Sequence, residues 1–314
     1  MEAIKGPSRW KVIHKDNIVT RDKISDWLYI FDEVNCTYFY LIVGEKKALL
    51  FDTGYAFTDI RPLVYEIVKD MPLYVVCSHG HDDHVLGCSQ FPEAYFSFAD
   101  WDLCMKNDNP EQLEKQILAR RESAPDIDNL VSREEYYKTS FANTKFLDVK
   151  DGDVFDLGGI TLKVYPVPGH TKGSIALYCP EKKAVFTGDV MAKGQPLIYG
   201  QSLAISSEPQ EFIHGLSRLK ELDIDIVWPA HGDAPLDASI ISETRDMLIA
   251  FAHEADPEKD AYLIPGPHIF GPKTDGPRTG YRFYYKDLAV NYNRGHLDQI
   301  REFMAANNGA VESK

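Results

Sequence analysis

His79-Gly80-His81-Asp82-Asp83-His84 (HGHDDH) follows LYVVCS at residues 73–78, a short apolar run typical of a strand buried on both faces. Two histidines at positions i and i+2, followed by an Asp-His pair, cannot lie on one face of a helix. They fit a tight loop that points several imidazoles inward. The stretch therefore predicts a loop of metal-ligand type at the end of a buried strand.

Four further polar residues stand where predicted strands end. They are Asp52 in FDTG, His170 in PGHTKGS, Asp189 in TGDV and His231 in PAHG. Side chains at strand ends can share one cleft while a packed sheet holds them rigid. Leaving Asp52 aside, the motifs offer five histidines and two aspartates. One zinc ion takes about four ligands, so this set suits two ions that share a carboxylate.

The remaining sequence predicts a mixed α/β chain. Helices are expected at residues 60–69, directly after HGHDDH, and at 208–222 and 239–255. Residues 99–145 look like short helices broken by proline and asparagine, which indicates a helical insertion. Strands are expected in several apolar or aromatic runs: 27–33, 36–43, 48–54, 73–78, 145–149, 153–167, 174–189 and 225–232.

Composition excludes several function classes. The 314 residues include 34 Lys and Arg against 48 Asp and Glu, a net charge of −14, which disfavours nucleic acid and acidic membrane surfaces as partners. No apolar run approaches the roughly 18–20 residues of a membrane span, and the first residues do not look like a secretion signal. The five cysteines form no CxxC pair, which argues against a disulfide framework. We expect a cytoplasmic protein with a small-molecule substrate. The sequence leaves open whether the protein forms a homo-oligomer.

HGHDDH matches the H-x-H-x-D-H signature of the metallo-β-lactamase superfamily, and the downstream His, Asp and His occur in that family's order. The chain thus resembles this family over about residues 27–250. The resemblance implies an α/β fold, the four-layer αββα sandwich, with the 99–145 segment as a helical insertion. It implies a metallo-β-lactamase domain at 1–260 and a C-terminal extension at 261–314, with a loop, an aromatic strand or hairpin and a final helix, packed on the same domain.

The resemblance also implies a role for each residue of the set. His79, His81 and His170 would hold the first metal, while Asp83, His84 and His231 would hold the second. Asp189 would bridge the two ions, and Asp52 would orient a ligand histidine from outside the ligand set. Two divalent ions are implied, with Zn²⁺ favoured and Mn²⁺ or Fe²⁺ as alternatives. Asp82 is expected to be a solvated neighbour.

Departures from family patterns indicate which branch of the family this chain is similar to. The bridging position is Asp189 where β-lactamases with a cysteine ligand have Cys, so the chain looks similar to the lactonase and glyoxalase II branch rather than to true β-lactamases. Lactonases place a catalytic Tyr three residues after the bridging Asp, where this chain has Ala192. Tyr199 and, in a Pro/Gly-rich loop, His268 are further catalytic candidates, although a structural role is the simpler interpretation for both.

The resemblance and the donor set predict a dinuclear metal hydrolase, in which Asp83 and Asp189 serve catalysis as ligands. A metal-bridging hydroxide would attack the carbonyl of a lactone, ester, thioester, amide or cyclic ketone. Three alternatives remain open at this point: a mononuclear iron enzyme like the persulfide dioxygenases, a phosphodiesterase or sulfatase, and a non-catalytic, metal-stabilised binding module.

Overall fold

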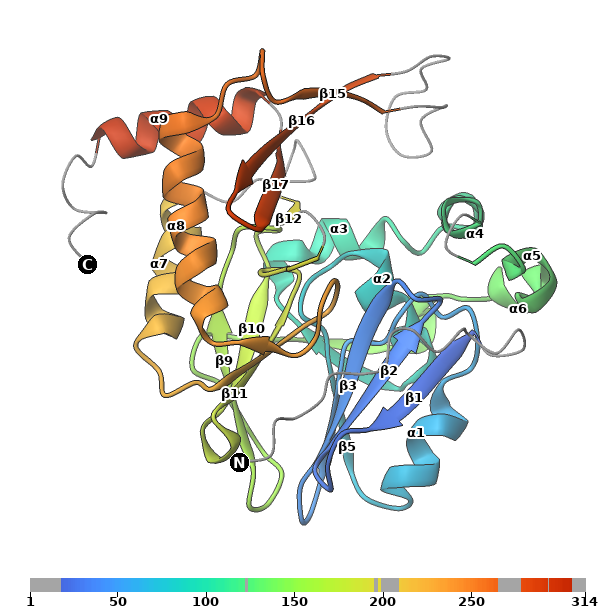
Figure 1. Ribbon diagram of the computed structural model, residues 1–314. Helices are drawn as coiled ribbons and strands as arrows, with labels where there is room; N and C mark the ends of the chain where they lie inside the picture. Colours follow the sequence, from blue (N-terminus) through green and yellow to red (C-terminus); the bar gives the residue numbers. More distant parts are fainter. Residues whose placement is uncertain are drawn as a thin grey trace. The chain divides into compact units, whose positions relative to one another are not determined.

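A computed structural model describes residues 18–121, 124–194, 197–198, 209–264, 278–292 and 294–306 of the chain (Figure 1). The chain divides into two compact units. The first comprises Met1–Val164 with Leu177–Lys182, and the second comprises Tyr165–Ala176 with Lys183–Lys314. No helix among the described residues is long and apolar enough to cross a membrane.

The first unit is built on a seven-stranded sheet whose strands follow one another in sequence order. The first four strands form antiparallel pairs, and the last four are parallel. Because the carboxyl ends of parallel strands share one edge, the loops that leave β4, β5 and β6 start side by side. The strands are β1 (Val19–Lys23), β2 (Leu28–Glu33), β3 (Thr37–Val43), β4 (Ala48–Phe51), β5 (Leu73–Val76), β6 (Glu93–Phe96) and β7 (Lys145–Asp148).

Apolar side chains on both faces explain why the middle of this sheet is buried. Nearly every residue of β3 and β4 is buried, and Phe31 stacks on Phe39 with ring centroids 4.8 Å apart. Helix α1 (Arg61–Val68) connects β4 to β5 and turns Val64 and Val68 into the core. Continuous burial of this kind holds the strand ends rigid, which a metal-ligand loop requires.

Short helices fill the chain between β6 and β7, as expected for residues 99–145. Helix α4 begins at Pro110, with Asn109 as its N-cap, and Ser132 caps the helix that starts at Arg133. Both caps are local features that can be recognised in the sequence itself. The helices are α3 (Trp101–Met105), α4 (Pro110–Arg120), α5 (Ile127–Leu130) and α6 (Arg133–Tyr136).

A second sheet has the strand order β14-β13-β11-β10-β9-β8. In the second unit, β11 pairs in parallel with β13, and β13 pairs antiparallel with β14. The ends of β11 and β13 therefore lie at one edge. The strands are β8 (Val154–Asp156), β9 (Thr161–Pro166), β10 (Ile175–Cys179), β11 (Ala184–Gly188), β13 (Ile226–Pro229) and β14 (Leu236–Asp237).

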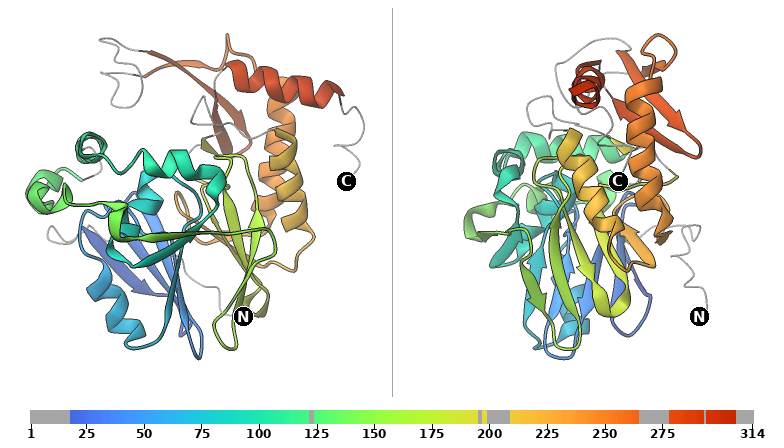
Figure 2. Two further views of the ribbon diagram at one scale, coloured as in Figure 1. Left: turned by 180° about the vertical axis from the view of Figure 1, so that it is seen from behind. Right: turned by 90° about the vertical axis from the view of Figure 1, so that its left-hand side faces the viewer.

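The second unit also carries a small aromatic sheet of order β12-β17-β16-β15. Helices α7 and α8 lie side by side (Figure 2), and α8 packs its Phe251 on Phe283 and Tyr292 of this sheet. The elements are β12 (Leu197–Ile198), α7 (Pro209–Lys220), α8 (Ser239–Glu254), β15 (Ala261–Ile264), β16 (Arg278–Tyr285), β17 (Leu288–Tyr292) and α9 (Arg294–Ala306).

The predicted elements are largely confirmed, with differences at their ends. The helices expected at 60–69, 208–222 and 239–255 correspond to α1, α7 and α8. The helix expected directly after HGHDDH begins inside the motif as α2 (Asp82–Val85), so Asp83 and His84 lie on a helix and not in the predicted loop. Strand β1 was not expected, because VTRDK is polar and lacks a clear alternation. It forms by antiparallel pairing of Val19–Lys23 with β2.

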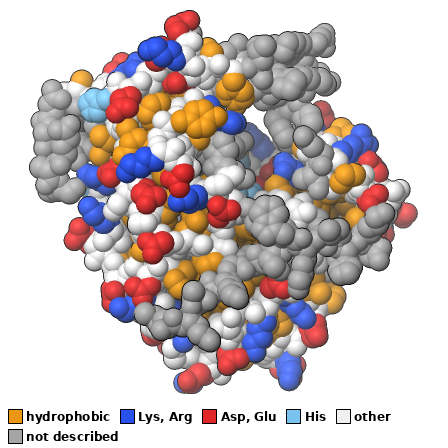
Figure 3. All heavy atoms as spheres, viewed as in Figure 1, with side chains coloured by type: hydrophobic (Ala, Val, Ile, Leu, Met, Phe, Trp, Pro, Cys, Tyr) orange, Lys and Arg blue, Asp and Glu red, His pale blue; other side chains and the backbone are white. Residues whose placement is uncertain are grey.

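On the face drawn in Figure 3, acidic and basic side chains are interspersed.

Candidate metal centre

Asp52 lies directly after β4 and is 1% exposed. Its backbone has a φ of 66°, a left-handed conformation that Asp tolerates better than most side chains. The carboxylate accepts hydrogen bonds from Ser78 N (2.6 Å) and Ser78 Oγ (2.9 Å), and Oδ2 lies 3.0 Å from Nδ1 of His84. The contact fixes the His84 ring and its tautomer, so that Nε2 is the nitrogen suited to a metal.

The other histidines of the HGHDDH loop form a tight cluster. Ser78 Oγ lies 2.9 Å from Nδ1 of His79, whose Nε2 lies 2.8 Å from Nδ1 of His81. The rings of His79 and His84 have centroids 4.1 Å apart, and Nε2 of His84 lies 3.4 Å from Oδ2 of Asp83. Ring nitrogens this close share a proton or a cation between their lone pairs. The cluster suits a divalent ion, which favours imidazole and carboxylate ligands.

Two buried side chains clamp the backbone of this loop. Asp100 Oδ2 accepts a hydrogen bond from Gly80 N (2.9 Å), and Asn107 Nδ2 donates to Gly80 O (3.0 Å). A Cβ at Gly80 would lie 2.9 Å from Cβ of Asp100 and 3.2 Å from the backbone nitrogen of Cys104. Glycine is therefore required at this close approach. The motif did not predict Asp100 or Asn107, since each belongs to a different part of the chain.

Asp82 differs from the expected solvated neighbour. It accepts a hydrogen bond from Gln116 of α4, whose side chain is buried. Burial, with the like charge of Asp83 beside it, raises the pKa of Asp82 to about 7. The helical segment therefore contacts the HGHDDH loop, a connection that the motif itself does not reveal.

The second unit holds the other three predicted ligands at strand ends. His170 follows β9, Asp189 follows β11 and His231 follows β13. Nε2 of His170 lies 3.3 Å from Oδ2 of Asp189, and Nε2 of His231 lies 3.2 Å from Oδ1 of Asp189. Each oxygen of this carboxylate thus faces a different imidazole. A carboxylate in this arrangement is suited to bridging two cations.

The loop that carries His170 is rigid for local reasons. Thr171 N donates to Ser174 Oγ (3.1 Å), and the two hydroxyl oxygens lie 2.8 Å apart. Gly169 packs so closely on α7 that a Cβ there would overlap the ring of Phe212. His170 is 3% exposed. Its orientation is therefore fixed by hydrogen bonds within the loop and by packing beneath it.

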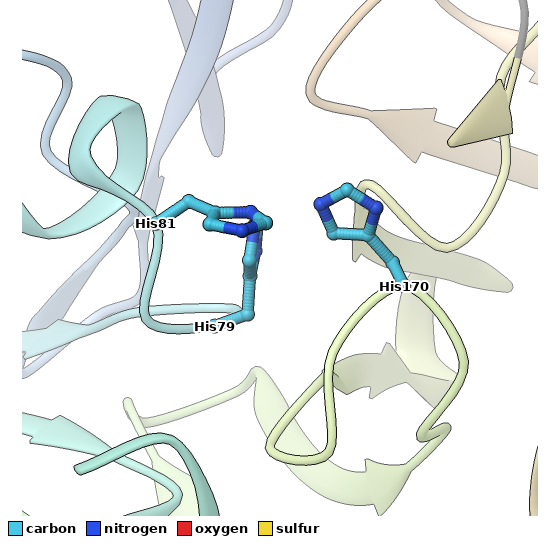
Figure 4. Close-up of side chains that lie close together, drawn as sticks. All are labelled: His79, His81 and His170. Atoms are coloured by element: carbon cyan, nitrogen blue, oxygen red, sulfur yellow. The ribbon is translucent and has the colours of Figure 1, made fainter. Parts of the chain in front are cut away.

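The predicted residues can now be placed. All seven expected ligands are among the described side chains that could hold a metal ion. Figure 4 draws the imidazoles of His79 and His81, from the loop after β5, and that of His170, from the loop after β9. Nitrogen and oxygen donors held by neighbouring hydrogen bonds fit divalent ions. The catalytic candidates Tyr199 and His268 lie outside the described residues.

Two cysteines lie beneath the HGHDDH loop. The Sγ atoms of Cys77 and Cys88 are 3.2 Å apart, both residues are buried, and Cys77 Sγ donates to His84 O (3.4 Å). Burial raises the pKa of the Cys77 thiol. A buried, protonated thiol is a poor nucleophile and a poor metal ligand. Cys77 is therefore a packing residue of the loop, and the buried Cys88 packs against it.

Comparison with known proteins extends over most of the chain. The family described as Metallo-beta-lactamase superfamily matches residues 35–249. The acyl-coenzyme A thioesterase MBLAC2 of Bos taurus is 27% identical over 216 residues, which cover 64% of this chain and 75% of the relative. The hydroxyacylglutathione hydrolase GloC of Haemophilus influenzae is 28% identical over 155 residues, which cover 48% of this chain and 64% of that enzyme.

A solved structure gives the same fold. The metallo-beta-lactamase from Pontibacter korlensis superposes with a TM-score of 0.50 at 21% sequence identity, covering 73% of this chain and 97% of that one. The predicted fold class is confirmed by these similarities.

Proposed function

Since this chain belongs to the metallo-beta-lactamase superfamily and is a metal-dependent hydrolase of that family, we propose that its two His and Asp clusters form one dinuclear centre that hydrolyses acyl thioesters. His79, His81 and His170 would hold one ion, while Asp83, His84 and His231 would hold the other. Asp189 would serve both. The observation that carries the proposal is that each carboxylate oxygen of Asp189 faces a different ligand histidine.

When bound, two divalent ions would lower the pKa of a water molecule toward about 7 and polarise the carbonyl oxygen of the substrate. The chain's own contribution is orientation. Asp52 holds the His84 ring through Nδ1, and the Ser78 hydroxyl contacts Nδ1 of His79. Hydrogen bonds of this kind fix the tautomer of a ligand histidine and raise its basicity.

A thioester suits this site better than an amide does. The leaving thiol has an ordinary pKa of about 8.5, so it departs as a thiolate near neutral pH without a strong general acid. An amide nitrogen must be protonated before it leaves. The relatives named as an acyl-coenzyme A thioesterase and a hydroxyacylglutathione hydrolase support the same class of bond. Lactones and oxygen esters share the carbonyl chemistry and form the comparison panel for the test.

The experiment compares the metal-loaded full chain with single variants on acyl-coenzyme A, an acyl-glutathione, a lactone and an oxygen ester. We expect thioester cleavage by the wild type, and a loss of more than about 100-fold in kcat/KM in Asp189→Ala and His81→Ala. Asp59→Asn, a change at an exposed ion pair with Arg61, is the matched control and should retain the rate. Thioester activity that survives both ligand substitutions would contradict the proposal, as would a wild type inactive on all thioesters.

A further inference from the structure

A cavity of about 250 Å³ lies on the small aromatic sheet of the second unit, outside the predicted metal ligands. Its lining combines two cations with two phenol rings and belongs to β15, β16 and the turn before them. The lining residues are Lys259, Asp260, Ala261, Tyr262, Arg282 and Tyr284.

Strand alternation explains why these side chains meet. Arg282 and Tyr284 stand two residues apart on β16 and therefore share a face. Phe283, between them, points to the opposite face, where it is buried against Phe251 of α8. Arg282 pairs in register with Asn291 of β17. The cavity therefore opens on the face of the sheet that α8 does not cover.

Arg282 is held in a defined orientation. Its guanidinium lies 4.9 Å from the ring centroid of Tyr262, and its Nε donates to Asn291 Oδ1 (2.8 Å). These contacts, together with hydrogen bonding to the side chains of Tyr262 and Tyr284, fix the plane of the guanidinium. A planar, anchored guanidinium of this kind is suited to phosphate oxygens.

The acidic residue of the lining, Asp260, already accepts hydrogen bonds from other residues of the chain. The Asp260 carboxylate accepts from Tyr292 Oη (2.7 Å) and from the backbone nitrogen of Asp256 (3.0 Å). Lys259 lies beside it and pairs with Asp256 at 2.8 Å. Lys259 is thus neutralised, and Arg282 is the lining cation for which the described residues supply no ion-pair partner. A guanidinium without a carboxylate partner favours an anionic ligand.

Tyr284 adds an aromatic surface at the mouth of the cavity. Tyr284 is 66% exposed, whereas large aromatic residues are ordinarily better buried. An exposed ring beside a guanidinium can stack on a planar base while the cation binds a phosphate. From the cavity, the anchored Arg282 and the exposed ring, we propose that this site binds a nucleotide through its base and a phosphate group.

The first test measures ADP binding by calorimetry to the metal-loaded full chain. Arg282→Gln should weaken binding by about tenfold or more, because it removes a charge-assisted contact. Tyr284→Leu should weaken it by about fivefold or more through lost stacking. Lys286→Gln removes an exposed cation outside the cavity and should leave binding within about twofold. The proposal is overturned if ADP does not bind the wild type, or if Arg282→Gln binds it unchanged.

The ligand is either a free nucleotide or the nucleotide portion of a coenzyme A thioester. A second arm, which rests on the proposed function, compares the KM values of acyl-coenzyme A and acyl-pantetheine in the wild type and Arg282→Gln. A rise for acyl-coenzyme A alone assigns the cavity to the substrate. Unchanged KM values with lost ADP binding assign it to a free nucleotide. Because ADP binding is measured without turnover, failure of the proposed hydrolysis does not affect the first test.

Discussion

Oδ2 of Asp100 accepts a hydrogen bond from the backbone nitrogen of Gly80 across 2.9 Å, 20 residues apart in sequence. Gly80 separates the first two histidines of the HGHDDH loop, so this contact sets the backbone that carries them. With Asn107 on the carbonyl side, both polar groups of one peptide residue are held by side chains from the following helical segment.

Asp100→Ala should therefore weaken metal binding as well as the fold. The substitution leaves a buried N–H without its acceptor, which costs about 1–3 kcal/mol in the free energy of unfolding. Metal affinity, measured by competition with a chromogenic chelator, should fall about tenfold or more, as for other residues that orient ligands. Asp102→Asn, exposed on the adjoining helix α3, is the control. Unchanged metal affinity in Asp100→Ala would contradict a positioning role.

Asp52→Asn tests the orientation of His84. The amide is close in shape to the carboxylate, but it cannot offer a negative oxygen to both Ser78 and Nδ1 of His84. We expect metal affinity to fall by about 10–100-fold while the far-ultraviolet circular dichroism stays unchanged. Asp59→Asn should bind metal as the wild type does. If the two variants behave alike, the Asp52 contact does not tune the ligand.

Gly169→Ala tests the packing under His170. A Cβ at this position overlaps the Phe212 ring, and overpacking of a core costs about 1–3 kcal/mol. The free energy of unfolding should fall by that amount in urea titrations. The double variant Gly169→Ala with Phe212→Leu should lose less stability than the sum of the losses in the two single variants, because leucine leaves room for the methyl group. Strict additivity would show that the two sites do not interact.

Glu33 predicts a particular pH dependence of stability. Burial raises the pKa of this carboxyl from 4.5 to about 8, although it accepts hydrogen bonds from the backbone of Tyr55 and Phe57. Between these pH values the folded chain holds a proton that the unfolded chain has lost. Stability should therefore fall as pH rises through this window, by about 1.4 kcal/mol per pH unit from this group, and level off above it.

Glu33→Gln should flatten that slope, since the amide does not titrate. Its absolute stability should be lower at acid pH, because one of the two backbone donors loses its acceptor. Urea unfolding from pH 5 to pH 9 gives the measurement, and the exposed Glu45→Gln is the matched control. A slope that is identical in the Glu33 variant and in the wild type would assign the pH dependence to other groups.

Most strands and helices could be predicted from the sequence, and the motifs named the side chains that the structure groups as possible metal ligands. HGHDDH, PGHTKGS, TGDV and PAHG each follow an apolar strand, and strand ends are visible in the apolar pattern. Asp100 and Asn107 could not be predicted, because their partners lie 20 and 27 residues away and the contacts exist only after folding. The aromatic run that contains Arg282 and Tyr284 predicts a strand, but it does not predict which face of that strand stays uncovered.

The central claim is that the two clusters together hold a pair of divalent ions. Elemental analysis of the purified chain, reconstituted with Zn²⁺ and freed of excess metal, tests it most directly. We predict about two equivalents per chain in the wild type and a clear loss in Asp189→Ala, which removes the shared carboxylate. One equivalent or none in the wild type, or an unchanged metal content in Asp189→Ala, would contradict the dinuclear centre.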